Sequence, residues 1–195
     1  LKYNVGGKDV WVGGAFDPVH IGHMIVASSA RMELGLDLLL FVPNALSPLK
    51  SSGPAASFEH RLAMLRLVVE GFDGYGVSDI EGRRGGISYT VDTLKELRSE
   101  FPGAELHLIV GADVLDEFHL WRDHEKIQQM AHLAYVERAG SDATPSRVAA
   151  VRVSMPQIDV SSTLIRDRLR HGQPIDALVP PAVAQYIAAH HLYSA

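Results

Sequence analysis

One stretch of this chain decides its fold, and it reads Gly13-Gly14-Ala15-Phe16-Asp17-Pro18-Val19-His20-Ile21-Gly22-His23. A short apolar run at 10–12 precedes it, and a segment with helical character follows at 23–34. Two glycines after a strand let the backbone turn sharply and approach a ligand closely. A helix start offers unpaired N–H groups and the positive end of a dipole, which both favour an anion. The stretch therefore predicts a strand, a glycine turn and a helix that together bind phosphate.

Two histidines add chemistry to this turn. His20 and His23 are three residues apart, so they share one face if the helix has begun. Two other interpretations exist, because a Gly-Gly pair is often an ordinary turn and two imidazoles also suit a metal ion. The nearest carboxylate belongs to Asp17, which precedes a proline, and Asp-Pro is first of all a turn signal. The pattern therefore favours anion binding over a metal site.

Composition limits the class of protein. The chain has 195 residues, 47% of them hydrophobic, which predicts a single domain over 1–195 with residues 1–8 as a leader of no assigned role. A formal net charge of −5 argues against sequence-independent binding of nucleic acid. The sequence has no cysteine, no apolar run long enough to span a membrane and no visible signal peptide. We expect a cytoplasmic protein, and the sequence leaves open whether it forms a homo-oligomer.

Strand and helix patterns alternate along the chain. Short β-branched or leucine-rich runs predict strands at 10–12, 38–42, 76–78, 106–111, 133–137 and 151–154. Helical patterns lie between them, with an apolar stripe from Phe58 to Val69 behind Ser57 as N-cap and a further helix over 89–101. Strands that alternate with helices imply an α/β fold with a doubly wound parallel sheet.

Ligands of such sheets lie beyond the carboxyl ends of the strands. The glycine turn is at such an end, as are Gly111 and Asp113 after the fourth strand and Arg138 after the fifth. The long loop over 43–57 follows the second strand and carries one charged residue, Lys50, which is either a binding group or a solvated loop lysine.

A second anchor lies late in the chain, where Ser161 or Ser162 is expected to cap a helix. Its predicted core face holds Leu164, Ile165 and Leu169, with Ser162, Arg166 and Arg170 on the opposite side. An arginine in the first turns opposes the helix dipole unless an anion is also bound. The alternative is a capped helix with a solvated arginine.

These motifs resemble the nucleotidyltransferases with an HxGH motif, Rossmann-like α/β enzymes that move an adenylyl or cytidylyl group onto a phosphate. GGAFDPVHIGH is similar to their GG(T/S)FDPxHxGH signature, and VSSTLIR is similar to their ISSTxIR motif, which holds the triphosphate. The chain departs at Ala15, where the family has a hydroxyl residue, and at Leu49, where relatives have a histidine before the lysine.

Three further stretches resemble the nicotinate mononucleotide adenylyltransferases within that family. They are SYTVDTL at 88–94, the spacing from Gly111 and Asp113 to Trp121, and the ending from Leu178 to Tyr193. Ser88 or Thr90 is expected near a helix cap, and Trp121 suits core packing as well as ring stacking.

The resemblance implies adenylyl transfer from ATP to nicotinate mononucleotide, with Mg²⁺ carried by the ATP phosphates and no protein ligands for the metal. It makes His20, His23, Lys50 and Arg166 catalytic. The residues implied for ATP are Gly13, Gly14, Ala15, Phe16, His20, His23, Gly111, Asp113, Arg138, Ser161, Ser162, Thr163 and Arg166. Those implied for nicotinate mononucleotide are Gly14, Lys50, Tyr89, Thr90, Val91 and Trp121.

Two rival functions remain at this point. One is a sibling adenylyltransferase that acts on nicotinamide mononucleotide or phosphopantetheine, against which the SYTVDTL stretch and the C-terminal ending argue in the case of phosphopantetheine. The other is a non-catalytic nucleotide sensor on the same fold, which Ala15 and Leu49 suggest.

Overall fold

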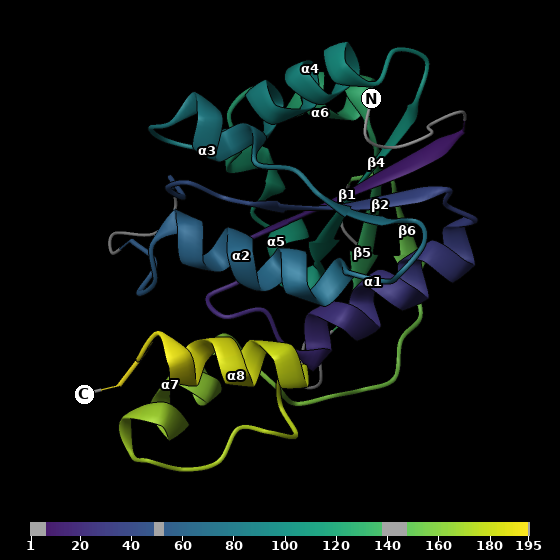
Figure 1. The fold of residues 1–195 in the computed structure, drawn as a ribbon. Helices are drawn as coiled ribbons and strands as arrows, with labels where there is room; N and C mark the ends of the chain where they lie inside the picture. Colours follow the sequence, from purple (N-terminus) through teal and green to yellow (C-terminus); the bar gives the residue numbers. More distant parts are fainter. Residues whose placement is uncertain (1–6, 49–52, 138–147, 195) are drawn as a thin grey trace.

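A computed structural model describes residues 7–48, 53–137 and 148–194. They form a parallel six-stranded sheet in the order β3-β2-β1-β4-β5-β6 (Figure 1). The strands are β1 (Lys8–Gly14), β2 (Leu38–Pro43), β3 (Tyr75–Val77), β4 (Glu105–Gly111), β5 (His132–Val136) and β6 (Ala150–Val153). This order places β1 in the middle, where the direction of winding reverses.

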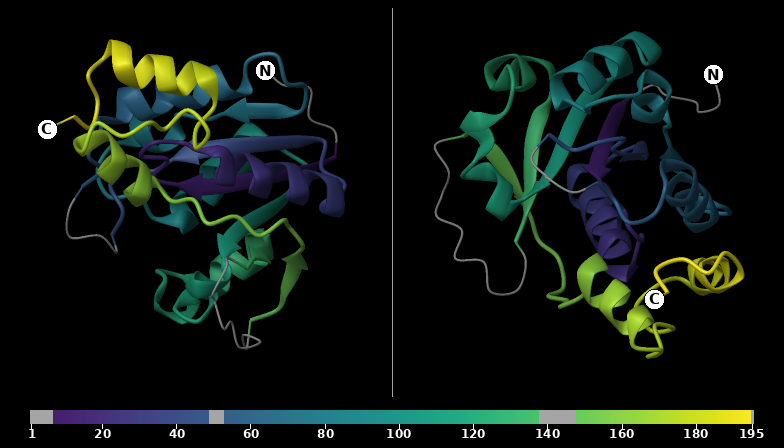
Figure 2. Two further views of the ribbon diagram at one scale, coloured as in Figure 1. Left: turned by 90° about the horizontal axis from the view of Figure 1, so that it is seen from below. Right: turned by 90° about the vertical axis from the view of Figure 1, so that its left-hand side faces the viewer.

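Helices cover both faces of the sheet (Figures 1 and 2). The described helices are α1 (Ile21–Leu34), α2 (Phe58–Val69), α3 (Ile80–Arg84), α4 (Thr90–Glu100), α5 (Ala112–Leu115), the 3₁₀ turn η1 (Phe118–Leu120), α6 (His124–Met130), α7 (Ser162–Arg170) and α8 (Pro181–Ala189). One face packs against α1, α2 and α8, and the other against α4 and α6. None of these helices is long and apolar enough to cross a membrane.

The predicted doubly wound sheet is confirmed, and each of the six predicted runs is a strand. The short elements α3, α5, η1 and α6 were not predicted, because helices of so few residues leave little periodicity in a sequence. One boundary was wrong: Lys8 belongs to β1 rather than to a leader. Residues 1–6 lie outside the described part.

Alternate faces of the strands fill two cores. Leu39 and Phe41 of β2 point to the face of α1 and α2, whereas Leu38, Leu40 and Val42 point to the face of α4 and α6. β2 is buried along its whole length. Continuous burial is what a central strand of a doubly wound sheet requires, since both of its faces are covered.

A buried carboxylate joins α3 to α4 on the second face. The Glu81 side chain is 4% exposed, and its Oε1 accepts a hydrogen bond of 2.7 Å from the Thr93 hydroxyl. Arg84 donates to the same hydroxyl from Nη2 at 3.0 Å. Burial raises the pKa of Glu81, and the hydrogen bonds from Ser88 and Thr93 oppose that shift. The folded protein therefore favours a protonated Glu81 more than the unfolded chain does.

This raised pKa predicts a pH dependence of stability. Because the folded pKa lies above the ordinary value of 4.5, the stabilisation is present below that pH and is lost as the pH rises through the folded pKa. Glu81→Gln cannot ionise. As the pH rises from about 4 to about 8, the free energy of unfolding of the wild type should therefore fall relative to that of Glu81→Gln. Urea denaturation across that range measures the difference, with the exposed Glu117→Gln as control. Curves that run parallel for wild type and Glu81→Gln would contradict the assignment.

Candidate active site

The glycine turn lies at the carboxyl end of β1, between the ends of β2 and β4. Gly14 pairs with Pro43 in the sheet register, and the Asn44 N–H donates to the Gly14 carbonyl at 2.9 Å. Phe16 follows in a left-handed conformation with φ of 49° and is buried. Its ring meets Phe41 edge-on at 5.6 Å, which fixes the turn to the core beneath.

The two histidines lie together at the start of α1. His20 is the N-cap residue, and its ring centroid is 3.7 Å from that of His23. The His20 backbone N–H donates to His23 Nδ1 at 3.2 Å, and the Phe16 ring lies 4.9 Å from the His23 ring. The prediction that the two imidazoles share one face is confirmed. Contacts within the protein thus hold both rings in place.

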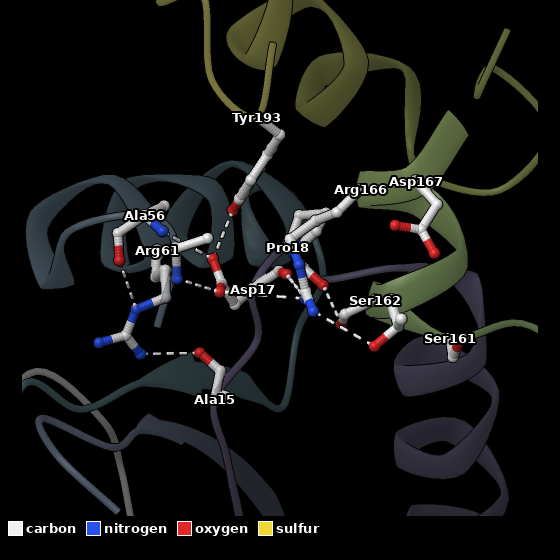
Figure 3. A network of polar contacts seen from close by, with 12 residues as sticks. Ala15, Asp17, Pro18, Ala56, Arg61, Ser161, Ser162, Arg166, Asp167 and Tyr193 are labelled. Atoms are coloured by element: carbon white, nitrogen blue, oxygen red, sulfur yellow. Dashed lines mark hydrogen bonds and ion pairs between the residues drawn. The ribbon is translucent and has the colours of Figure 1, made fainter. Parts of the chain in front are cut away.

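The carbonyls of the turn are held by side chains from distant elements (Figure 3). Arg61 of α2 donates from Nη1 to the Ala15 carbonyl at 2.7 Å. Arg166 of α7 donates from Nη1 to the Asp17 carbonyl at 2.7 Å, and the Ser162 hydroxyl donates to the Pro18 carbonyl at 2.9 Å. Buried carbonyls outside a sheet or helix need such donors. These contacts dock the start of α7 on the histidine turn.

The Asp17 carboxylate is buried within the same network. Its Oδ2 accepts from the Ala55 N–H at 2.6 Å, and its Oδ1 accepts from the Ala56 N–H at 3.0 Å and from the Tyr193 hydroxyl at 2.8 Å. Arg166 Nη1 lies 4.0 Å from Oδ2. The side chain is more than a turn residue, because it joins the turn to the end of the 43–57 loop and to the segment after α8.

Burial and charge set the pKa values of its neighbours. Desolvation lowers the pKa of Arg61, which is 1% exposed, and the charge of Asp17 partly offsets this. Burial, followed by the charge of Asp17, raises the pKa of the Tyr193 hydroxyl far above its usual range. Tyr193 therefore stays protonated and acts as a donor to Asp17 at any physiological pH.

The α7 helix follows the prediction in part. Ser161 is the N-cap, and its hydroxyl accepts from the Leu164 N–H at 3.2 Å. Leu164 was wrongly placed in the core, because it is 37% exposed whereas Ile165 is fully buried. Arg166 was expected to face away from the core, yet it turns to the Asp17 carbonyl and also donates to the Thr163 hydroxyl at 3.2 Å. The inward face of α7 thus combines core packing by Ile165 with docking of Ser162 and Arg166 on the turn.

The start of α4 lies beside the loop after β2. The Ser88 N–H donates to the Leu46 carbonyl at 2.8 Å, and the Ala45 N–H donates to the Ser88 hydroxyl at 3.0 Å. Neither predicted hydroxyl caps the helix, since Tyr89 is the N-cap, Thr90 is the first helical residue and the Ser88 oxygen accepts from the loop instead. The tether brings the first turn of α4, with Thr90 and Val91, to the same edge of the sheet as the glycine turn.

Trp121 follows η1 and packs on Phe118 with ring centroids 5.5 Å apart. It is half-buried against the second core, as its packing interpretation predicts. The next residue, Arg122, stacks over the Tyr89 ring at 4.6 Å, so this segment lies against the start of α4. Stacking of Trp121 on a bound ring stays a prediction.

The remaining predicted residues divide into two groups. Gly13 ends β1, Gly111 ends the neighbouring β4, and Asp113 is exposed in the first turn of α5. Lys50 and Arg138 lie outside the described residues. Within the described part, no three histidine, aspartate or glutamate side chains form a group that could hold a metal ion.

Sequence reasoning missed two residues of the network, Arg61 and Tyr193. Arg61 carries a signal in retrospect, because an arginine beside the apolar stripe of α2 has to find acceptors when it is buried. Tyr193 gives no such signal, since it contacts Asp17 across 176 residues of sequence.

Comparisons with known proteins agree with this geometry. A family model described as cytidylyltransferase-like matches residues 11–168, which is the class of protein that the fold and the site define. A probable nicotinate-nucleotide adenylyltransferase of Rhodopirellula baltica is 41% identical over 195 residues, covering 93% of this chain and 91% of that protein. The corresponding protein of Gemmatimonas aurantiaca is 42% identical over 193 residues, covering 93% and 90%. The chain belongs to the family of nicotinate-nucleotide adenylyltransferases.

Solved structures show the same fold. The nicotinic acid mononucleotide adenylyltransferase of Plasmodium falciparum, complexed with NaAD, superposes with a TM-score of 0.76 at 20% identity, over 95% of this chain and 97% of that chain. The same Plasmodium enzyme complexed with APC gives a TM-score of 0.76 at 19% identity, over the same shares of the two chains.

The geometry explains the glycine between the two histidines and predicts the effect of replacing it. A Cβ on Gly22 would lie 3.0 Å from the His20 ring and 3.7 Å from the Val160 carbonyl, so the His20 ring would have to move. If His20 acts in catalysis, as the motif predicts, Gly22→Ala should lower turnover about tenfold or more, because small displacements of a catalytic group are costly. Its stability should not fall, since alanine is favoured over glycine in a helix by about 1 kcal/mol.

Turnover and thermal unfolding of Gly22→Ala measure the two effects. Ser28→Ala, at an exposed position of the same helix, serves as control. Wild-type turnover in Gly22→Ala would show that the position of the His20 ring does not matter.

Proposed function

We propose that this enzyme transfers the adenylyl group of ATP to nicotinate mononucleotide, giving nicotinate adenine dinucleotide and pyrophosphate. The observation that carries the proposal is the close pair of imidazoles, His20 and His23, on a turn to which Arg166 is docked. The turn lies where the sheet reverses its winding, the usual place for a nucleotide in such folds. The names of the relatives specify the acceptor.

The reaction needs alignment and charge neutralisation more than acid–base chemistry. A phosphate oxygen of nicotinate mononucleotide attacks the α-phosphorus of ATP, and a new P–O bond forms. The bond from the α-phosphorus to the bridging oxygen breaks, and pyrophosphate leaves with the electron pair. Because the nucleophile is already anionic, no general base and no covalent intermediate are required.

Each group at the turn has a use in that step. The imidazoles of His20 and His23 donate to the phosphate oxygens, on which charge accumulates. The start of α1 adds backbone N–H groups and the positive end of the helix dipole. Arg166 offers a planar guanidinium to the β- and γ-phosphates, and the start of α7 adds further N–H groups. Lys50, outside the described residues, is proposed as a further cation at the acceptor phosphate.

The first turn of α4 is the proposed subsite for the pyridine carboxylate. Tyr89, Thr90 and Val91 lie where helix N–H groups lack partners within the helix. Such donors suit a carboxylate, which carries a full charge and accepts on both oxygens. The tether from Ser88 to the loop after β2 holds this turn close to the glycine turn.

Mg²⁺ is the cofactor that we propose, bound through the ATP phosphates. The carboxylate in the turn, Asp17, already accepts hydrogen bonds on both oxygens, so it is not available as a ligand. That donor set fits an ion held by phosphate oxygens and water, which is how Mg²⁺ usually binds with nucleotides. The ion supplies positive charge to the leaving pyrophosphate.

Assay of pyrophosphate release from ATP separates the rival functions. Nicotinate mononucleotide, nicotinamide mononucleotide and phosphopantetheine are compared as acceptors, with and without Mg²⁺. A sensor would bind ATP and release no pyrophosphate with any of them. Cytoplasmic location stays a prediction.

The histidine pair gives a direct prediction about catalysis. His20→Ala and His23→Ala should each lower kcat by roughly 10²–10³, the usual loss for one preorganised donor, with the fold intact. His132→Ala, at the opposite end of the sheet on β5, is the matched control and should keep wild-type kcat. Near-normal turnover in both site variants would remove the histidines from the catalytic step.

The α4 subsite predicts selectivity for the acid over the amide. A carboxamide would turn its NH₂ group towards a backbone donor, so one charged hydrogen bond is lost and a buried donor is left unpaired. These losses cost about 1.5–3 and about 1–3 kcal/mol, so kcat/KM should favour nicotinate mononucleotide by on the order of 10² or more. Kinetics with both mononucleotides at saturating ATP measure the ratio. Equal values would remove the assignment to residues 89–91.

A further inference from the structure

We propose that Tyr193 is a positioning residue for ATP binding, and that it acts through Asp17 on Arg166. The inference rests on the proposed use of Arg166 at the ATP phosphates. Tyr193 itself lies outside the turn, in the segment that follows α8, and its hydroxyl donates to Asp17 Oδ1 at 2.8 Å (Figure 3).

The position of Tyr193 is fixed by more than this bond. His191 and Tyr193 both have positive φ, of 51° and 64°, which side chains with a Cβ adopt rarely and only when their surroundings enforce it. The Leu192 N–H donates to the Ile187 carbonyl at 3.0 Å, and Leu192 and Tyr193 pack against the first core. The backbone strain is thus maintained by contacts that aim the hydroxyl at Asp17.

Asp17 faces Arg166 in two ways. Its carbonyl oxygen accepts from Arg166 Nη1 at 2.7 Å, whereas its carboxylate oxygen Oδ2 lies 4.0 Å from the same nitrogen. A bound triphosphate has to compete with that carboxylate for the guanidinium. The Tyr193 hydroxyl and the N–H groups of Ala55 and Ala56 disperse the charge of the carboxylate. Arg166 therefore stays bonded to the Asp17 carbonyl, and its other N–H groups can donate to a phosphate.

Removal of the Tyr193 hydroxyl changes the competition between the Asp17 carboxylate and a bound triphosphate for Arg166. With one donor fewer, the buried carboxylate is a stronger partner for Arg166, and a direct ion pair would form at the expense of the phosphates. The effect concerns the ATP side of the site. The subsite at the start of α4 shares no described contact with Tyr193, so binding of nicotinate mononucleotide should change little.

Steady-state kinetics and calorimetric ATP binding test the proposal with Tyr193→Phe. We expect KM and Kd for ATP to rise about tenfold, the size expected for one hydrogen bond to a charged group, with KM for nicotinate mononucleotide changed less than about twofold. Tyr186→Phe is the matched control, because it removes a tyrosine hydroxyl from α8 that contacts His60 Nδ1 at 3.0 Å instead of the turn. Unchanged ATP constants in Tyr193→Phe, or an equal rise in Tyr186→Phe, would overturn the proposal.

A double-mutant cycle with Arg166→Lys separates positioning from general stability. If Tyr193 acts through Arg166, Tyr193→Phe should change the ATP constants by less than about twofold in the Lys background. The same tenfold effect in both backgrounds would contradict the proposal. Should Tyr193→Phe not fold, Tyr193→Leu, which also lacks a donor at this place, enters the same cycle under the same criterion. Wild-type ATP constants in Arg166→Lys would instead argue against the proposed role of Arg166, and wild-type inactivity would argue against the proposed function.

Discussion

The backbone of residues 15–18 enters the interior without belonging to a strand or a helix, and much of the structure follows from that. Its carbonyls have to be satisfied, because an unpaired buried carbonyl costs about as much as a lost hydrogen bond. Arg61, Ser162 and Arg166 satisfy the carbonyls of Ala15, Pro18 and Asp17, and they come from α2 and α7. The requirement for donors thus holds two helices, remote from the turn in sequence, against the end of β1.

The same requirement gives the site its preorganised shape. Since the turn is fixed by the core below and by side chains above, the His20 and His23 rings are held with their centroids 3.7 Å apart. Gly22 leaves the space that the His20 ring fills. Catalysis of phosphoryl-type transfer depends mainly on such alignment, so the geometry that satisfies the backbone is also the geometry that the chemistry needs.

The sequence predicted what depends on local pattern and missed what depends on distant contacts. Strand runs such as 38–42 and the apolar stripe of α2 are periodic signals, and both were confirmed. The predicted orientation of the Arg166 side chain was wrong, because its hydrogen bond to Asp17, 149 residues away in sequence, overrides the helical pattern of α7. Ser88 illustrates the same limit: a hydroxyl near a helix start suggests a cap, yet a loop N–H from Ala45 takes it. Motif resemblance implied the site residues, and only the fold shows which contacts hold the described ones in place.

A buried carboxylate beside an anion site needs an explanation, since Asp17 would by itself repel a triphosphate. Its charge is compensated three ways: by two backbone N–H groups, by the Tyr193 hydroxyl and by the guanidinium of Arg166 at 4.0 Å. Arg61 adds a second guanidinium, which is buried, and burial lowers its pKa from a value so high that it stays charged. Two cationic side chains therefore accompany one carboxylate, and the net charge of these three side chains is positive. The carboxylate orders the donors around it, and the excess positive charge favours an anion at the turn.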